Sequence, residues 1–87
     1  MASPRPLTNP PIETHIGTID ADCLWPAQRL AIEVDAPSTH GSRPAMVKDR
    51  RRDRALILAG WTPSRIMEED LEDEVALARE ISALLAA

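Results

Sequence analysis

Length, composition and charge restrict this chain to one small domain. Its 87 residues suffice for a single core, and 44% of them are hydrophobic, although Trp25 and Trp61 are the only aromatic residues. No apolar run predicts a membrane span or a signal peptide, so we expect a cytoplasmic protein with no membrane partner. The single cysteine, Cys23, excludes an internal disulfide and a zinc site built from cysteines.

The charge is distributed unevenly along the chain. A net charge of -4 argues against a protein that coats nucleic acid non-specifically. From Arg43 to Arg54, however, six basic residues stand against two acids, a local charge of +4. From Met67 to the end, seven acids stand against one base, a local charge of -6. The total therefore hides a basic segment.

The first part of the chain predicts an extended arm and two short strands. Residues 1–11 are rich in proline and polar side chains, so we expect an extended or disordered arm without a helix. Apolar and polar residues follow a strand pattern over 12–16 and again over 18–24, with a break at Gly17. Two short strands are expected here.

The clearest strand is predicted over 29–35, after a turn at 25–28. Its aliphatic residues alternate with charged ones and so predict one apolar and one charged face. If the turn joins an antiparallel hairpin, residues whose numbers sum to about 55 lie opposite one another. The apolar residues of both strands then share one face: Ile19, Ala21 and Cys23 with Leu30, Ile32 and Val34.

The same register gathers four carboxylates on the other face of the hairpin. It places Asp22 across from Glu33 and Asp20 across from Asp35. Like charges in these positions are destabilising, so the arrangement calls for a cation, for protonation or for strong solvent exposure. Magnesium takes oxygen ligands of this kind and would support phosphodiester hydrolysis. The alternative is a solvated polar face without a ligand.

His40 is a candidate catalytic residue because it follows Asp35 closely. The intervening loop is short enough to bring its imidazole beside the carboxylates. There the ring could act as a general base toward water or donate to a phosphate oxygen. The alternative is an exposed loop histidine without a role.

A basic helix is predicted from Ser42, a suitable N-cap with Pro44 in the first turn, to one or two residues before Gly60. Its cations would contact DNA phosphates in a salt-sensitive manner without reading sequence. The candidate DNA-binding residues are Lys48, Arg50, Arg51, Arg52 and Arg54. The alternative is a solvated helix in which Asp49 and Asp53 pair with arginines.

The last third of the chain predicts an edge strand and an amphipathic helix. Residues 61–66 occupy the place of a strand, but Pro63 lacks a backbone donor and restricts this segment to an edge or an irregular conformation. Over 68–85, apolar residues recur at helical spacing and acids crowd the first turns. The face expected to pack on the sheet contains Leu71, Val75, Ala78, Ile81 or Ser82, and Leu85.

Residues 22–61 resemble a known family, and they read DCLWPAQRLAIEVDAPSTHGSRPAMVKDRRRDRALILAGW. The ordered set is Asp-x-x-Trp-Pro, Glu-Val-Asp, a following His, and Asp-Arg-Arg-Arg-Asp before Gly-Trp. This set is similar to the middle of the domain of unknown function 559 group. That group is related to very-short-patch-repair (Vsr) endonucleases of the PD-(D/E)XK restriction-endonuclease-like superfamily. The match spans about half the chain.

The resemblance implies metal-dependent cleavage of a DNA phosphodiester bond, with Mg²⁺ or Mn²⁺ as cofactor and DNA as partner. Asp22 matches the first metal-binding aspartate, and Glu33 and Asp35 match the acidic pair on the next strand. These three are therefore the candidate metal ligands and, together with His40, the candidate catalytic residues. The charged helix motif is matched by Asp49, Arg50 and Asp53.

The chain also departs from the family pattern. Relatives usually begin with a further helix that carries an active-site glutamate, and nothing before Met1 supplies it, so we expect a truncated Vsr-like domain over 12–87. Ala36 replaces the usual glycine after Glu-Val-Asp. Asp35 replaces the lysine of the superfamily name. Pro63 falls where relatives have a regular strand.

The expected fold class is α+β (α/β). We expect a small restriction-endonuclease-like sheet of three to four strands, with an antiparallel hairpin and two flanking helices. The expected function is that of a metal-dependent DNA endonuclease-like domain that hydrolyses phosphodiester bonds. The alternative is a non-catalytic DNA-binding or protein-interaction remnant of the same fold.

Overall fold

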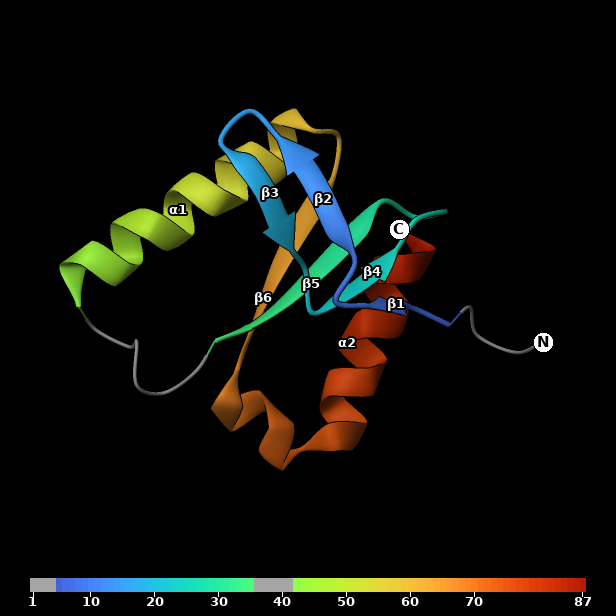
Figure 1. The fold of residues 1–87 in the computed structure, drawn as a ribbon. Helices are drawn as coiled ribbons and strands as arrows, with labels where there is room; N and C mark the ends of the chain where they lie inside the picture. The colour runs from blue at the N-terminus through green and yellow to red at the C-terminus, as the bar shows by residue number, and fades with distance from the viewer. Residues whose placement is uncertain (1–4, 36–41) are drawn as a thin grey trace.

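A computed structural model describes residues 5–35 and 42–87 and has an α+β architecture (Figure 1). A mixed four-stranded sheet has the order β1-β4-β5-β6, and β2 and β3 form a separate two-stranded sheet. The strands are β1 (Leu7–Thr8), β2 (Pro11–Thr14), β3 (Gly17–Asp20), β4 (Cys23–Trp25), β5 (Leu30–Asp35) and β6 (Thr62–Met67). The helices are α1 (Arg43–Leu58), the short 3-10 helix η2 (Glu68–Glu72) and α2 (Glu74–Ala86).

The predicted hairpin is present and has the predicted register. β4 and β5 are antiparallel, with Leu24 opposite Ala31 and Trp25 opposite Leu30. α1 lies between β5 and β6 in the chain, and β6 joins the far side of β5 as a parallel strand at the edge of the sheet. The edge position tolerates Pro63, as expected. The α+β class with a hairpin and two helices is thus confirmed.

Helices cover both faces of β5 (Figure 1). On one face, Leu30 and Ile32 belong to a core cluster that α2 covers through Leu77, Ile81 and Leu85. On the other face, Ala31 packs in a second cluster with Leu56 of α1. β5 is therefore buried continuously from Leu30 to Glu33, so the predicted charged face is not solvated at Glu33, and Val34, which was expected on the apolar face, is 43% exposed.

The expected face of Ile19 and Ala21 is wrong. Both residues belong to the cluster under α1, whereas Cys23 lies with Ile32 under α2 as expected. The reason is that the strand predicted over 18–24 is divided. Among the described strands, β3 pairs with β2 alone, and the chain returns to the four-stranded sheet, to which β1 also belongs, at the start of β4.

The arm expected over 1–11 is extended where the structure describes it. β1 pairs with β4, with Leu7 opposite Leu24 and Thr8 opposite Cys23. β2 begins at Pro11, the last residue of the segment that was expected to be an extended or disordered arm. The arm therefore contributes the second edge of the sheet.

α1 has the predicted ends. The Ser42 hydroxyl accepts a hydrogen bond from the Ala45 N–H at 3.2 Å, and Pro44 lies in the first turn, where its missing N–H has no consequence. The helix ends at Leu58, and Gly60 then adopts a positive φ of 94°. These local signals can be read from sequence because they depend on neighbouring residues alone.

Arg29 fastens the end of α1 to the start of β5. It was expected as the first strand residue, but its φ of 58° places it in the preceding turn. Its Nε donates to the Gly60 carbonyl oxygen at 3.1 Å, and its guanidinium carbon lies 4.3 Å from the centre of a Trp61 ring. The positive φ of Gly60 favours glycine at this position, and a Cβ atom there would lie 2.6 Å from Arg29 Nη2 and would displace that guanidinium group.

The helix predicted over 68–85 is divided in two. η2 comes first, and α2 then begins at the N-cap Asp73, whose carboxylate accepts from the Ala76 N–H at 3.1 Å. Leu71 and Val75, which were expected to pack, are 46% and 64% exposed. Within the described ranges, neither α1 nor α2 has the length and apolar character that crossing a membrane requires.

Leu56 and Leu58 provide a matched test of the core. Leu56 is 0% exposed and Leu58 is 74% exposed. We expect Leu56→Ala to lower the free energy of unfolding by about 2–5 kcal/mol, because a cavity opens beneath α1. We expect Leu58→Ala to change it by less than about 0.5 kcal/mol. Urea denaturation followed by tryptophan fluorescence measures both values, and equal losses would contradict the packing described above.

Candidate functional site

Most of the predicted site residues surround one cavity of about 300 Å³, which we call the acidic cavity. Its walls come from the end of β3, the connection to β4, the end of β5, and parts of α1 and β6. The carboxylates that line it are Asp20, Asp22, Glu33, Asp35 and Asp49. The cations that line it are Lys48, Arg52 and Arg65. Among the described residues of this lining, five acids stand against three cations, which is an excess of negative charge.

Strand geometry explains why Glu33 and Arg65 meet. In the parallel ladder of β5 and β6, Arg65 is the partner of Glu33, and partners on neighbouring strands share a face. Ala31 lies under α1, and side chains two residues apart point to the same side of a strand. Glu33 and Arg65 therefore both point toward α1.

Glu33 is a buried charge with two guanidinium partners. It is only 5% exposed, and a buried carboxylate needs a nearby positive charge to offset the loss of hydration. Arg52 Nη2 of α1 donates to Glu33 Oε1 at 2.8 Å, and Arg65 Nη2 lies 3.4 Å from Oε2. Among the described residues, arginines thus supply the neutralising charge that clustered acids require.

Arg65 joins the end of β5 to α1. Its Nη1 donates to Asp35 Oδ1, and its Nη2 donates to Asp53 Oδ1 at 2.8 Å. Asp49 Oδ1 lies 3.7 Å from Arg65 Nη1. Burial lowers the pKa of Arg65, but hydrogen bonds and attraction from Asp35 and Asp53 outweigh burial and raise that pKa above its ordinary value. The guanidinium group therefore stays charged. Asp49 and Asp53 do pair with an arginine, but one from β6 instead of from their own helix.

Arg65 was not among the sequence-predicted site residues. The segment over 61–66 was expected to be an edge strand or irregular. The directions of its polar side chains were therefore not predicted. A usable signal was present, since Arg65 directly precedes the buried Ile66 and must point to the opposite side of the strand. Pairing with Glu33 needed the parallel register, which sequence alone did not provide.

Asp22 lies where the hairpin register placed it, but the expected pair of Asp20 and Asp35 is wrong. The Val34 N–H donates to Asp22 Oδ2 at 2.6 Å, which fixes this carboxylate at the end of β5. Asp20 instead pairs with Pro11 in the β2–β3 hairpin. Because β3 and β4 are separate strands, Asp20 does not pair with β5. Its side chain nevertheless lines the acidic cavity.

The five candidate DNA-binding residues fall into two groups. Lys48 and Arg52 line the acidic cavity, and Arg52 is held by Glu33. The other three are exposed and make no ion pair with any residue of the described ranges: Arg50, Arg51 and Arg54. Arg50, Arg51 and Arg54 line a different pocket from the acidic cavity, so α1 presents these cations to solvent on other faces than the one that Lys48 and Arg52 share.

The predicted metal ligands fit a hard divalent ion in donor chemistry but are partly occupied. Within residues 5–35 and 42–87, no group of three or more His, Cys, Asp or Glu side chains is arranged to hold a metal ion. Glu33 is bound by arginines, whereas Asp22 Oδ1 and Asp35 Oδ2 accept no hydrogen bond from another described residue. Mg²⁺ often takes one or two protein carboxylates with water and phosphate. His40 lies outside the described residues.

The ion-pair network makes Arg65 a determinant of stability. We expect Arg65→Met to lower the free energy of unfolding by about 3 kcal/mol, because Asp35 and Asp53 lose their hydrogen-bond donor and Glu33 loses one cation. Arg54→Met, at an exposed arginine, should change it by less than about 0.5 kcal/mol. Chemical denaturation measures both. In a double-mutant cycle with Glu33→Gln, additive losses would contradict the proposed coupling.

Cys23 reports the charge of its neighbour Asp22. Burial raises the pKa of the Cys23 thiol, and repulsion of the thiolate by Asp22 raises it further. Because the thiolate is the reactive form, alkylation by iodoacetamide should reach half its maximal rate at a higher pH in the folded chain than in urea. Asp22→Asn should move this midpoint downward, whereas Glu80→Gln on α2 should not. A midpoint that Asp22→Asn leaves unchanged would contradict the electrostatic contact.

No protein-family model, curated protein or solved structure matches the chain. The resemblance to the domain of unknown function 559 family therefore stays a prediction from the sequence over 22–61. Of the residues in those motifs that the structure describes, Asp22, Glu33, Asp35, Asp49 and Arg52 line the acidic cavity. A functional assignment must therefore be argued from the charges and contacts of this site.

Proposed function

We propose that this chain is a metal-dependent DNA endonuclease-like domain of the restriction-endonuclease-like type, which hydrolyses phosphodiester bonds. The observation that supports this most is the acidic cavity, where five carboxylates and three cations of the described residues meet, on a helix that carries further exposed arginines on its other faces. Such a lining suits the joint binding of a divalent cation and a phosphate group. The proposal is further supported because Asp22, Glu33 and Asp35, the acids that match the family motifs, all line this cavity.

The described residues of the proposed site have different roles. Asp22 and Asp35 each keep one carboxylate oxygen with which to hold Mg²⁺ or Mn²⁺. The ion, when bound, would polarise the phosphate and lower the pKa of a coordinated water. Lys48 and Arg52 at the rim contact non-bridging phosphate oxygens and stabilise their charge. Arg65 acts as a positioning residue because it holds Asp35 in place.

The exposed cations of α1 extend the proposed site toward the DNA backbone. Arg50, Arg51 and Arg54 follow one another along the outer surface of the helix and have no acidic partner in the described part of the chain. Contacts from these side chains to phosphates would position DNA without selecting a sequence. His40 keeps the role that the family resemblance implies, as the residue that assists hydrolysis.

A second candidate function is a DNA-binding domain that does not cleave. The contacts of Glu33 favour it specifically, because Arg52 and Arg65 already neutralise this carboxylate. A domain of this kind needs no metal ion to stabilise its buried acid. It would bind DNA in a salt-dependent manner through α1 and would lose that binding when Arg50, Arg51 and Arg52 are replaced together.

Cleavage of supercoiled plasmid distinguishes the two functions. With Mg²⁺ or Mn²⁺, we expect the full chain to convert supercoiled plasmid to the nicked form, and EDTA to prevent this. Asp22→Asn should reduce nicking to background, because an amide is a poor metal ligand, while its oxygen still accepts from the Val34 N–H. Agarose gel electrophoresis over time measures the rate.

Glu80→Gln is the matched control for that experiment, since Glu80 is an exposed acid on α2 and does not line the acidic cavity. It should leave the nicking rate unchanged. Absence of nicking with either metal would exclude the cleavage proposal, and salt-dependent DNA binding would then favour the second function. Nicking that persists in Asp22→Asn would show that the activity arises elsewhere.

A further inference from the structure

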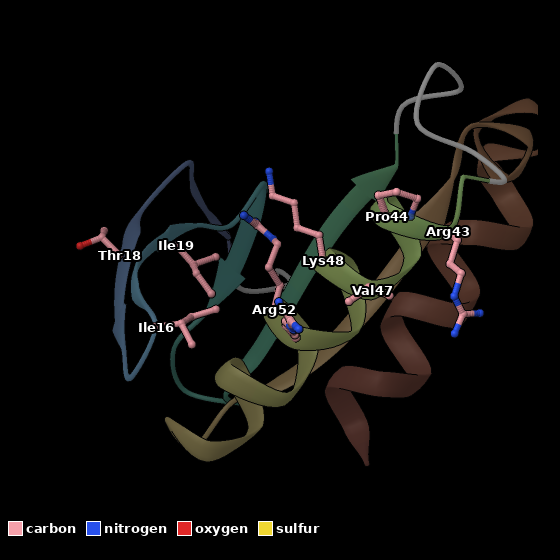
Figure 2. A pocket seen from close by; sticks show the side chains of 9 residues that line it. Ile16, Thr18, Ile19, Arg43, Pro44, Val47, Lys48 and Arg52 are labelled. Atoms are coloured by element: carbon pink, nitrogen blue, oxygen red, sulfur yellow. The ribbon is translucent and has the colours of Figure 1, made fainter.

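A second cavity of about 620 Å³ lies between the β2–β3 hairpin and the N-terminal half of α1 (Figure 2). We call it the hairpin–helix groove. Ile16 and Ile19 line it from the hairpin, and Val47 lines it from α1. Its cations include Arg43, Lys48 and Arg51. The cleavage chemistry proposed above does not require a groove at this place.

The apolar part of the groove is accessible to a ligand. Ile16, in the turn between β2 and β3, is 51% exposed, and Val47 is 38% exposed. Figure 2 shows Ile16 and Ile19 pointing from the hairpin toward α1, whereas Thr18 points away from it. A mainly apolar lining with a few charged groups at its border is typical of a ligand-binding pocket.

The charged part of the groove lacks counter-ions. Arg43, Lys48 and Arg51 are exposed and form no ion pair with any residue of 5–35 or 42–87. None of the described residues that line the groove is acidic. The local potential is therefore positive and attracts anions. A complementary ligand combines an apolar body with negative charge.

The groove adjoins the acidic cavity. Lys48 and Arg52 line both cavities, so these two side chains form the boundary between them. A nucleic-acid strand carries a phosphate on each side of every base. A base inserted in the groove would consequently place an adjoining phosphate at Lys48, where the acidic cavity begins.

We propose that the hairpin–helix groove binds one unpaired nucleotide of single-stranded DNA, next to the phosphate at the acidic cavity. This inference rests on the proposed action on DNA. An unpaired base offers the apolar faces that Ile16 and Val47 can contact, and its phosphates match the free cations. In a duplex those faces are covered by the neighbouring stacked bases, so the apolar surface of the groove could not contact them. The domain therefore selects unpaired segments of DNA.

Binding in EDTA tests this inference without cleavage. Fluorescence anisotropy of a labelled short oligonucleotide, single-stranded or annealed, measures the affinity of the full chain. We expect the single strand to bind at least about fivefold more tightly than the duplex. Ile16→Ser should raise the Kd for the single strand by about fivefold and leave duplex binding unchanged. Arg51→Gln should weaken both and lower the salt dependence by about one charge.

Two exposed positions away from the groove serve as controls. Leu7 of β1 is also 51% exposed, so Leu7→Ser makes the same kind of change as Ile16→Ser outside the groove. Arg79→Gln on α2 matches Arg51→Gln in charge. Both controls should bind like the parent chain. A 2-aminopurine base in the single strand should gain fluorescence on binding, because insertion separates it from its stacked neighbours.

Several outcomes would overturn the inference. These are equal affinity for single strand and duplex, equal effects of Ile16→Ser and Leu7→Ser, and displacement of the oligonucleotide by poly-glutamate of equal total charge. The last would identify an acidic peptide as the occupant. If the single-strand preference holds while plasmid nicking fails, the groove remains a DNA site and only the cleavage proposal is lost.

Discussion

The buried carboxylate of Glu33 is the constraint on which the rest of the arrangement depends. Removing a carboxylate from water costs several kcal/mol unless a charged partner compensates. Here the partners come from two elements, Arg52 from α1 and Arg65 from β6. Through their contacts with this one side chain, both α1 and β6 are linked to β5. A chain with so small an aliphatic core gains much of its specificity from this polar network.

The same network links folding to the candidate site. Arg65 stabilises the domain and also holds Asp35, one of the predicted metal ligands. Carboxylates that are already hydrogen-bonded keep a fixed orientation, which is what a binding site for a cation or a phosphate needs. The cost is that part of their charge is already neutralised by the protein. An incoming cation must therefore use the remaining oxygens of Asp22 and Asp35 or compete with a guanidinium group.

Much of the fold could be predicted because its signals are local. The turn before β5 set the hairpin register, Ser42 and Gly60 set the ends of α1, and Pro63 indicated an edge strand. The errors have a common physical cause. Alternation tells which residues share a face, but it does not tell which element covers that face, or where a strand leaves one sheet for another.

The candidate site shows the same division between local and tertiary information. Asp22, Glu33 and Asp35 were located by register, and the structure brings all three to the acidic cavity. Arg65 was missed because its role arises from a parallel pairing across 32 residues, between β5 and β6. The hairpin–helix groove likewise depends on how β2 and β3 sit against α1, for which no short sequence pattern exists.

The fastening of Arg29 to Gly60 and Trp61 has a mechanical consequence for α1. This helix is held at its C-terminal end, where Arg29 donates to the carbonyl oxygens of Ala59 and Gly60 just after the helix and where its two buried residues, Ala55 and Leu56, lie. Its N-terminal half projects beyond these contacts with exposed side chains such as Val47 and Arg51. A ligand that contacts Val47 or Arg51 would therefore bind the exposed half of α1, whereas the buried half and the ion pairs of Arg52 and Asp53 hold the helix against the sheet.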